Sequence, residues 1–221
     1  LNAIIDKTRH TTNKNTIVSG SYKLLKIDKL DNQPISEKIT NKIQFYIKKE
    51  KTDAIIFSDF RHGIFNKTNI SLFILSINKG VFRAADSQVA TRWGNITDFK
   101  NFDLITPNER EARFSLADQD SNISELTRNL ALVTNYKNLI LKLGERGVFS
   151  VSNINSKKPE DTQSFTIPSF VSKAEDIVGA GDALLAYSTL TLISTGSLII
   201  SSIIGSIAAA CECENSGNIV I

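Results

Sequence analysis

Aspartates and glycines are concentrated in one stretch of the sequence, Asp176-Ile-Val-Gly-Ala-Gly-Asp182. Its two glycines let the backbone turn tightly and come close to a ligand. An apolar run that begins at Ala183 follows at once and predicts a helix, whose first free N–H groups would make an anion site. Asp182 could take a proton from a hydroxyl while these amides stabilise a developing negative charge. The alternative is a glycine-rich turn in which Asp182 is only the helix N-cap.

An amide and a carboxylate stand three residues apart in Thr106-Pro-Asn-Glu-Arg-Glu111, which follows a predicted strand. One helical turn separates Asn108 from Glu111, so the two side chains could face the same ligand. Together they could hold the water shell of Mg²⁺, which usually keeps several of its waters in proteins. The alternative is a helix N-terminus with favourably placed acids.

The first stretch resembles the signature of the ribokinase/PfkB family of sugar kinases, Asp-(Thr/Val)-x-Gly-Ala-Gly-Asp, with Ile177 in place of the usual Thr or Val. The resemblance implies transfer of the γ-phosphoryl group of ATP to a hydroxyl of a sugar or sugar phosphate. It implies Asp182 as the catalytic base, and Asp176 as a residue that helps to bind a monovalent cation, K⁺. The anion hole would then consist of the amides of Gly179, Ala180 and Gly181.

Two further motifs of this family have counterparts in the same order along the chain. Asn108 and Glu111 match its Asn-x-x-Glu, which acts on Mg²⁺ and phosphate. The stretch Lys142-Leu-Gly-Glu-Arg-Gly147, by itself a hairpin turn, resembles the nucleotide loop Thr-x-Gly-x-x-Gly, so Gly144 and Gly147 would bind ATP. Lys142 stands where Thr or Ser is usual, and it would either reach a phosphate or be a solvated residue at a strand end.

Two basic stretches resemble one branch of the family, the heptose-phosphate kinase domain of the ADP-heptose pathway. Arg9-His-Thr-Thr-Asn-Lys14 resembles its lid region, through which a homodimer would form. Residues 59–63, Asp-Phe-Arg-His-Gly, resemble its Asp-Tyr-x-Lys-Gly. The substrate residues implied for a phosphorylated sugar are Lys14, Asp59, Arg61 and His62. The alternative is a solvated basic loop.

Apolar periodicity predicts the elements that must position these residues. We expect two short strands around residues 19–21, strands over 53–58, 81–85, 102–106, 139–143, 147–152 and 165–168, and helices over 35–50, 66–79, 107–112, 122–135 and from 183. Strands that alternate with helices predict an α/β fold with a mostly parallel sheet covered on both faces. In such sheets ligands bind outside the carboxyl ends of the strands, where the candidate residues lie.

The resemblance makes this a three-layer ribokinase-like fold with a small β lid. We expect one domain over residues 1–221, in which 1–30 form a lid-like segment and 31–221 a nucleotide-binding core. Because the chain starts at Leu1, holds no methionine and begins with the lid-like segment, we expect a piece of a longer protein. That piece would lack the N-terminal strands and would not phosphorylate a sugar by itself.

Composition limits the class of protein. The 221 residues suffice for one α/β domain, and a net charge of +3 is too small to indicate a nucleic-acid partner. Cys211 and Cys213 lack the spacing of a redox pair or a zinc half-site, so a reduced, cytoplasmic protein is expected.

Residues 183–210 carry no charge and are long enough to cross a bilayer. Ser194-Thr-Gly-Ser197 interrupts them, which favours two buried helices and no membrane partner. Two rival functions remain at this point. One is a nucleotide sensor that binds ATP without turnover, and the other is a membrane-associated protein anchored by residues 183–210.

Overall fold

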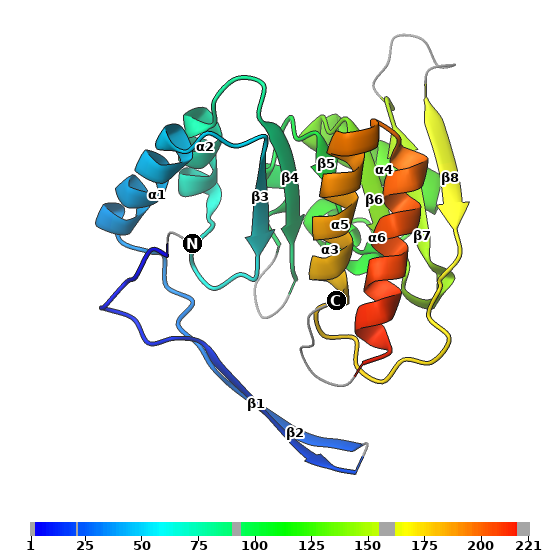
Figure 1. The fold of residues 1–221 in the computed structure, drawn as a ribbon, viewed down its shortest axis with the longest axis horizontal. Helices are drawn as coiled ribbons and strands as arrows, with labels where there is room; N and C mark the ends of the chain where they lie inside the picture. Colours follow the sequence, from blue (N-terminus) through cyan, green and yellow to red (C-terminus); the bar gives the residue numbers. More distant parts are fainter. Residues whose placement is uncertain (1–2, 21, 90–93, 155–161, 216–221) are drawn as a thin grey trace. The chain divides into compact units, whose positions relative to one another are not determined.

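The structure is a computed structural model that describes residues 3–20, 22–89, 94–154 and 162–215. The chain forms two compact units. The first unit comprises Leu1–Glu50 and Arg61–Asn78, and the second comprises Lys51–Phe60 and Lys79–Ile221 (Figure 1). The chain therefore contributes one strand to the second unit before it returns to the first. The expected division at residue 30 stays a prediction.

The first unit holds a β-hairpin and two helices. The hairpin consists of β1 (Asn13–Ser19) and β2 (Tyr22–Lys29), which pair antiparallel and confirm the two strands predicted around residues 19–21. Helix α1 (Glu37–Lys49) packs on helix α2 (Lys67–Ser76). Polar side chains fix where these helices begin, because they accept hydrogen bonds from the first free N–H groups.

The second unit is built on a six-stranded sheet in the order β3-β4-β5-β6-β7-β8. Its strands are β3 (Ala54–Asp59), β4 (Phe82–Ser87), β5 (Leu104–Ile105), β6 (Asn138–Lys142), β7 (Val148–Ser152) and β8 (Gln163–Ile167). The first four run parallel, and β7 and β8 are antiparallel to their neighbours. This arrangement confirms the prediction of a mostly parallel sheet. The strand expected over residues 102–106 is much shorter, since only Leu104 and Ile105 pair on both sides.

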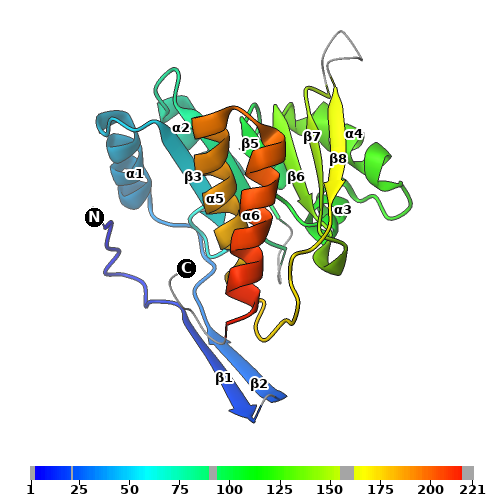
Figure 2. The same ribbon diagram turned by 45° about the vertical axis from the view of Figure 1, so that its right-hand side comes forward.

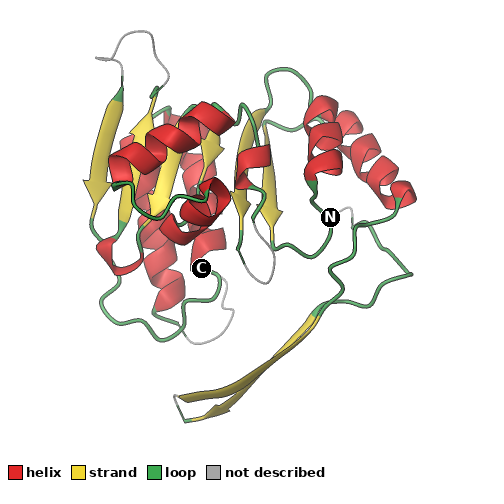
Figure 3. Cartoon of the chain, turned by 180° about the vertical axis from the view of Figure 1, so that it is seen from behind, coloured by secondary structure: helices red, strands yellow, loops and turns green. Residues whose placement is uncertain are grey.

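Helices cover both faces of this sheet. They are α3 (Glu109–Leu116), α4 (Ile123–Thr134), α5 (Ala180–Thr195) and α6 (Leu198–Cys213), with short 3₁₀ turns over residues 96–98 and 144–146. Helices α5 and α6 lie on one face (Figures 1 and 2), and α3 and α4 lie on the other (Figure 3). The second unit therefore has three layers, helices on sheet on helices.

The uncharged C-terminal segment forms two helices, as its sequence predicts. Gly196 ends α5 in the left-handed conformation (φ 66°), and the side chain of Ser197 caps α6. The two helices pack closely through small residues, and the Ser201 hydroxyl donates to the carbonyl of Ser188 at 2.8 Å. Within the described part of the chain, no helix combines the length and the apolar character needed to cross a membrane.

Candidate active site

The N-terminus of α5 is open. Its N-cap residue is Gly179, which provides no side-chain cap for the first N–H groups of the helix. Gly179 has φ 94°, and a Cβ there would lie 2.5 Å from Oε1 of Glu212, so a larger residue would be strained and would also clash. The free amides at this helix start can therefore bind an anion, as the sequence predicts.

Asp182 lies in the first turn of α5, where its side chain is exposed. The alternative that Asp182 is the N-cap is wrong, because the helix begins at Ala180, before the apolar run that predicts it. The Asp182 carboxylate accepts a hydrogen bond from the hydroxyl of Ser58 on β3 (3.0 Å). This bond holds the carboxylate beside the open amides, within reach of a ligand.

Lys142 is the last residue of β6, and its side chain is only 16% exposed. Its Nζ lies 2.6 Å from Oδ2 of Asp86, near the carboxyl end of β4. The alternative that Lys142 is a solvated residue at a strand end is therefore wrong. A Cβ on Gly181 would lie 3.3 Å from Nζ and 4.0 Å from the Asp86 oxygen. The ion pair therefore lies directly against the first turn of α5.

Asn108 and Glu111 form a capping box at the start of α3. The Asn108 side chain accepts from the Glu111 N–H (2.8 Å), and the Glu111 side chain accepts from the Asn108 N–H (2.7 Å). Their spacing is thus explained by helix capping, which was the alternative to a ligand site. Glu111 is buried, and burial raises its pKa to about 7, with a further increase from Asp86 and an opposing effect of Lys142.

Three carboxylates interact with the single ammonium group of Lys142. The interacting side chains are Asp86, Glu111, Asp182 and Lys142. When all are ionised, three negative charges face one positive charge. Among the described residues, no group of three His, Cys, Asp or Glu side chains could hold a metal ion alone. This donor set fits Mg²⁺, which is usually bound through waters, one or two carboxylates and substrate phosphates.

The glycines of the 142–147 stretch form the turn between β6 and β7. Gly144 and Gly147 have φ 63° and 84°, and the Gly147 N–H donates to the Gly144 carbonyl at 2.9 Å. The hairpin turn is therefore present. A Cβ on Gly147 would lie 2.1 Å from the carbonyl oxygen of Ile167, whereas a Cβ on Gly144 would meet no atom. The fold therefore requires a glycine at position 147. At position 144 the surface is open to a ligand.

A pocket of about 800 Å³ lies between this turn and α3. Its lining includes Asn108, Arg110, Arg113, Phe114, Lys142, Leu143 and Gly144. The Arg110 guanidinium lies over the Phe114 ring, 5.4 Å from its centroid. The pocket is thus large enough for a nucleotide-sized ligand and provides both aromatic and cationic groups.

Asp176 lies beside the last turn of α6. Its backbone N–H donates to the carbonyl of Cys213 (3.1 Å), and its carboxylate accepts from the Val178 N–H (3.2 Å). Glu212 belongs to the same helix end, where carbonyl groups carry partial negative charge. The carboxylate of Asp176 provides oxygen atoms of the type that could bind a monovalent cation.

The substrate residues implied for a phosphorylated sugar occur in both units. In the first unit, Arg9 donates to the carbonyl of His62 (3.0 Å), and His62 Nδ1 lies 3.4 Å from the Thr12 hydroxyl. Burial lowers the pKa of His62, and the nearby charge of Lys14 lowers it further. Arg61, which precedes His62, has a left-handed backbone (φ 62°).

Asp59 has a different environment in the second unit. It is 2% exposed, and its Oδ2 accepts from Ser87 Oγ and from Asn95 Nδ2, both at 2.8 Å. These bonds anchor the end of β3 to the end of β4 and to the chain that follows it. The role of Asp59 toward a substrate stays a prediction.

The model of the pfkB family carbohydrate kinases matches residues 8–220. The chain belongs to this family. Among curated proteins, the bifunctional protein HldE of Helicobacter pylori (strain J99) is 24% identical to this pfkB family chain over 223 residues. The match covers 99% of the chain but only 44% of HldE, so the chain spans less than half the length of that relative.

Solved structures of two other proteins share the fold. Phosphofructokinase-2 from Escherichia coli in complex with potassium has a TM-score of 0.70 at 17% identity, over 87% of this chain and 62% of that one. The tetrameric inhibited form of phosphofructokinase-2 has a TM-score of 0.69 at 16% identity, over 86% of this chain and 62% of that one. Ribokinase from Giardia lamblia has a TM-score of 0.70 at 16% identity, over 95% of this chain and 67% of that one. The predicted ribokinase-like fold of this pfkB family chain is confirmed.

Two site residues carry no sequence signal that separates them from ordinary strand residues. Asp86 and Ser58 each lie in a short strand, and neither belongs to one of the motifs, although Ser58 directly precedes the 59–63 stretch. Only the folded sheet brings Asp86 to Lys142 and Ser58 to Asp182. Their position near the carboxyl ends of predicted parallel strands was the one available indication.

Proposed function

We propose that this pfkB family chain is the kinase part of an enzyme that transfers the γ-phosphoryl group of ATP to a hydroxyl of a sugar or sugar phosphate. The observation that carries the proposal is the exposed carboxylate of Asp182 beside the open N-terminus of α5. The acceptor oxygen attacks the γ-phosphorus while Asp182 takes its proton. The bond from that phosphorus to the β,γ-bridging oxygen breaks, and ADP leaves.

The amides of Gly179, Ala180 and Gly181 are placed to stabilise the transferred phosphoryl group. Because these amides are fixed at a helix start, they need little reorganisation during the reaction. Mg²⁺, when bound with ATP, supplies positive charge to the phosphates. Asn108 and Glu111 would hold it through water, and the excess of carboxylates over cations supports this role.

The nucleotide and a monovalent cation have separate proposed sites. ATP would bind along Lys142, Gly144 and Gly147, supported by the adjacent pocket of about 800 Å³. K⁺ would bind at Asp176, beside the carbonyl-rich end of α6.

A phosphorylated sugar such as a heptose phosphate is the acceptor that we propose. Lys14, Arg61 and His62 carry groups that can bind a phosphate. Burial is the main cause of the lowered pKa of His62, and the positive charges of Lys14 and Arg9 lower it further. Asp59 would act on the acceptor only through the backbone that it anchors. The enzyme would work in the cytoplasm.

Acceptor-dependent release of ADP by the complete protein tests this function. A panel of sugars and sugar phosphates, with heptose phosphates included, should contain one acceptor that raises ADP release far above the rate without acceptor. If ATP binds and no acceptor raises the rate, the protein is a nucleotide sensor and the proposed transfer is wrong.

A second copy of the chain is the partner that we propose for the β1–β2 hairpin. Ile17, Leu25 and Ile27 lie on one face of this hairpin, and each is about half exposed. A two-stranded hairpin is at best marginally stable in water without packing. Phosphofructokinase-2 has a tetrameric form, so association occurs in this fold.

A further inference from the structure

Asp86 is a buried carboxylate that none of the motifs includes. It is 7% exposed and lies on β4, while its partner Lys142 lies on β6. The two-residue strand β5 separates these strands, so the ion pair crosses its carboxyl end. Oδ2 of Asp86 accepts from Lys142 at 2.6 Å, and Oδ1 accepts from the Ser87 N–H at 3.1 Å. The Asp86 carboxylate is thus held on both sides.

Stability alone does not account for this pair. Taking two charges out of water costs free energy that their mutual attraction often fails to recover, and apolar side chains of similar size frequently serve as well. The position of the pair gives another reason for its presence. Nζ of Lys142 would lie 3.3 Å from a Cβ on Gly181, at the helix start that is open to anions.

Lys142 has the properties of a fixed phosphate-binding cation. An ammonium group has three donors, and Asp86 takes one of them. Although burial opposes it, the carboxylates of Asp86 and Glu111 raise the pKa of Lys142, so the ammonium stays charged. Lys142 also lines the pocket beside the 142–147 turn, which keeps its side chain accessible from that direction.

We propose that Lys142 binds the terminal phosphates of the nucleotide at the N-terminus of α5, and that Asp86 is the positioning residue that holds the ammonium there. The proposal rests on the function proposed above and adds Asp86 and a second cation beside Mg²⁺. Asp86 prevents the flexible lysine from leaving the site when no nucleotide is bound, so less side-chain entropy is lost on binding.

Titration calorimetry on the full chain, with ATP and AMP in excess Mg²⁺, tests the proposal. Lys142→Met should weaken ATP binding by about tenfold or more, because a charge-assisted hydrogen bond is lost. AMP binding should change little, because AMP lacks the terminal phosphates. Asp86→Asn should weaken ATP binding less than Lys142→Met does, and Asp86→Glu should restore part of it.

The double variant Asp86→Asn/Lys142→Met separates binding from folding. Removing both charges leaves no unpaired buried ion, so the double variant should melt close to the wild type while binding ATP as weakly as Lys142→Met. If either the double variant or Lys142→Met binds ATP like the wild type, the pair is only structural and this proposal is wrong. If the folded wild type binds no ATP at all, the proposed kinase function fails with it.

Discussion

At the residue scale, the proposed base Asp182 predicts that catalysis can be lost while binding of ATP is kept. Asp182→Asn keeps the size of the side chain and an oxygen that can accept from Ser58, but it removes the proposed base. In the complete protein we expect acceptor-dependent turnover to fall by about 10²- to 10⁴-fold, while the affinity for ATP stays close to that of the wild type. ADP release and ATP titration measure the two quantities.

Ser58→Ala is the matched control for this variant. It removes a single hydrogen bond to the carboxylate and leaves the base in place, so turnover should fall by about tenfold or less. If Asp182→Asn retains more than about a tenth of the wild-type turnover, or behaves like Ser58→Ala, Asp182 is not the base.

The buried Glu111 predicts a pH dependence of stability. Its pKa of about 7 in the folded protein exceeds its ordinary value of 4.5, so the folded state binds more protons between these two values. This contribution to stability is therefore complete below pH 4.5 and is lost as the pH rises to about 7. At about 1.4 kcal/mol per pH unit, the loss is on the order of 3 kcal/mol.

Glu111→Gln isolates this effect, because glutamine can keep the capping box and does not titrate. Thermal unfolding is measured without metal. As the pH rises from 4.5 to 7, the wild type should lose stability relative to Glu111→Gln. A difference that is constant over this range would show that Glu111 has an ordinary pKa in the folded protein.

The sequence identifies site residues that occur in motifs and misses those that act by position. Asp182 and the glycines before it are recognisable because their types and order are specific. Asp86 is a single acid in a short strand, and its partner Lys142 lies two strands away in the sheet. Such a contact depends on strand order and side-chain direction, which residue spacing does not specify.

At the element scale, the turn between β6 and β7 contains two glycines with different roles. We expect Gly147→Ala to lower the free energy of unfolding by roughly 2 kcal/mol or more, because its Cβ would clash with the Ile167 carbonyl in addition to the cost of a left-handed backbone. Gly144→Ala has open space around it and should cost only about 1–2 kcal/mol. Denaturant unfolding compares the two.

Nucleotide binding by the same two variants completes this test. Because the fold does not need the space above Gly144, a loss of ATP affinity in Gly144→Ala would come from the approach of the nucleotide. If Gly144→Ala destabilises the protein as much as Gly147→Ala does, both glycines are structural, and the turn gives no support to a nucleotide site.

Element boundaries show why periodicity alone has limits. Helix α5 begins at Ala180, earlier than its apolar run, since the polar residues of its first turn give no periodic signal. Strand β5 is shorter than the apolar stretch that predicts it. Phe102 in this stretch is buried by packing but does not belong to the strand, so an apolar residue need not be a strand residue. The break at Gly196 was predictable, because a glycine readily adopts the left-handed conformation that ends many helices.

At the scale of the whole molecule, the division into two units was not predictable from composition. No linker rich in glycine or proline marks it, and the chain crosses the boundary more than once. Residues 51–60 enter the second unit because β3 pairs along its length with β4. Sheet pairing between distant segments therefore decides the unit to which each segment belongs.

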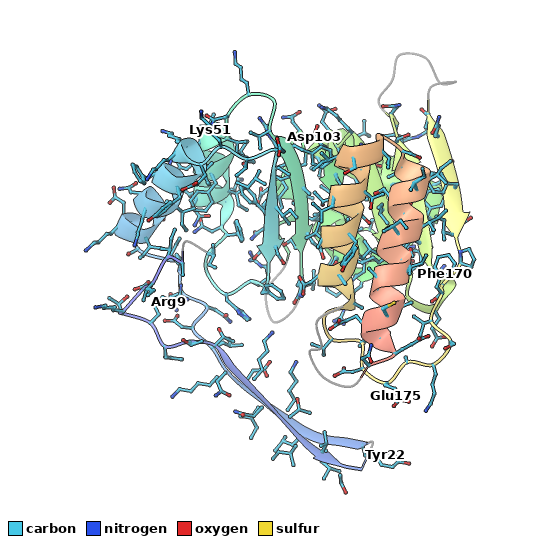
Figure 4. All side chains as sticks on the ribbon, viewed as in Figure 1. Arg9, Tyr22, Lys51, Asp103, Phe170 and Glu175 are labelled. Atoms are coloured by element: carbon cyan, nitrogen blue, oxygen red, sulfur yellow. The ribbon has the colours of Figure 1, made fainter. Side chains whose placement is uncertain are left out.

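The hairpin of the first unit predicts self-association. Register places Ile17 opposite Leu25 and Asn15 opposite Ile27, so these residues share one face. The other face carries polar side chains at Thr16 and Lys26, which lie opposite each other, while the exposed apolar side chains of Val18 and Leu24 lie nearer the hairpin tip. The side chain of Tyr22 projects from the hairpin tip (Figure 4), where it is 75% exposed. A group of exposed apolar side chains is typical of a surface that packs on another.

We expect sedimentation velocity to show association that grows with protein concentration, and Leu25→Lys to abolish it by placing a charge in the centre of the apolar face. Thr16→Lys adds the same charge to the opposite face of the hairpin, beside Lys26, and should leave association unchanged. Both positions are exposed, so neither lysine should unfold the two units. Equal association of Leu25→Lys and wild type would show that the apolar face of the hairpin is not the contact between copies. Loss of association in Thr16→Lys as well would point to a general effect of charge on the hairpin.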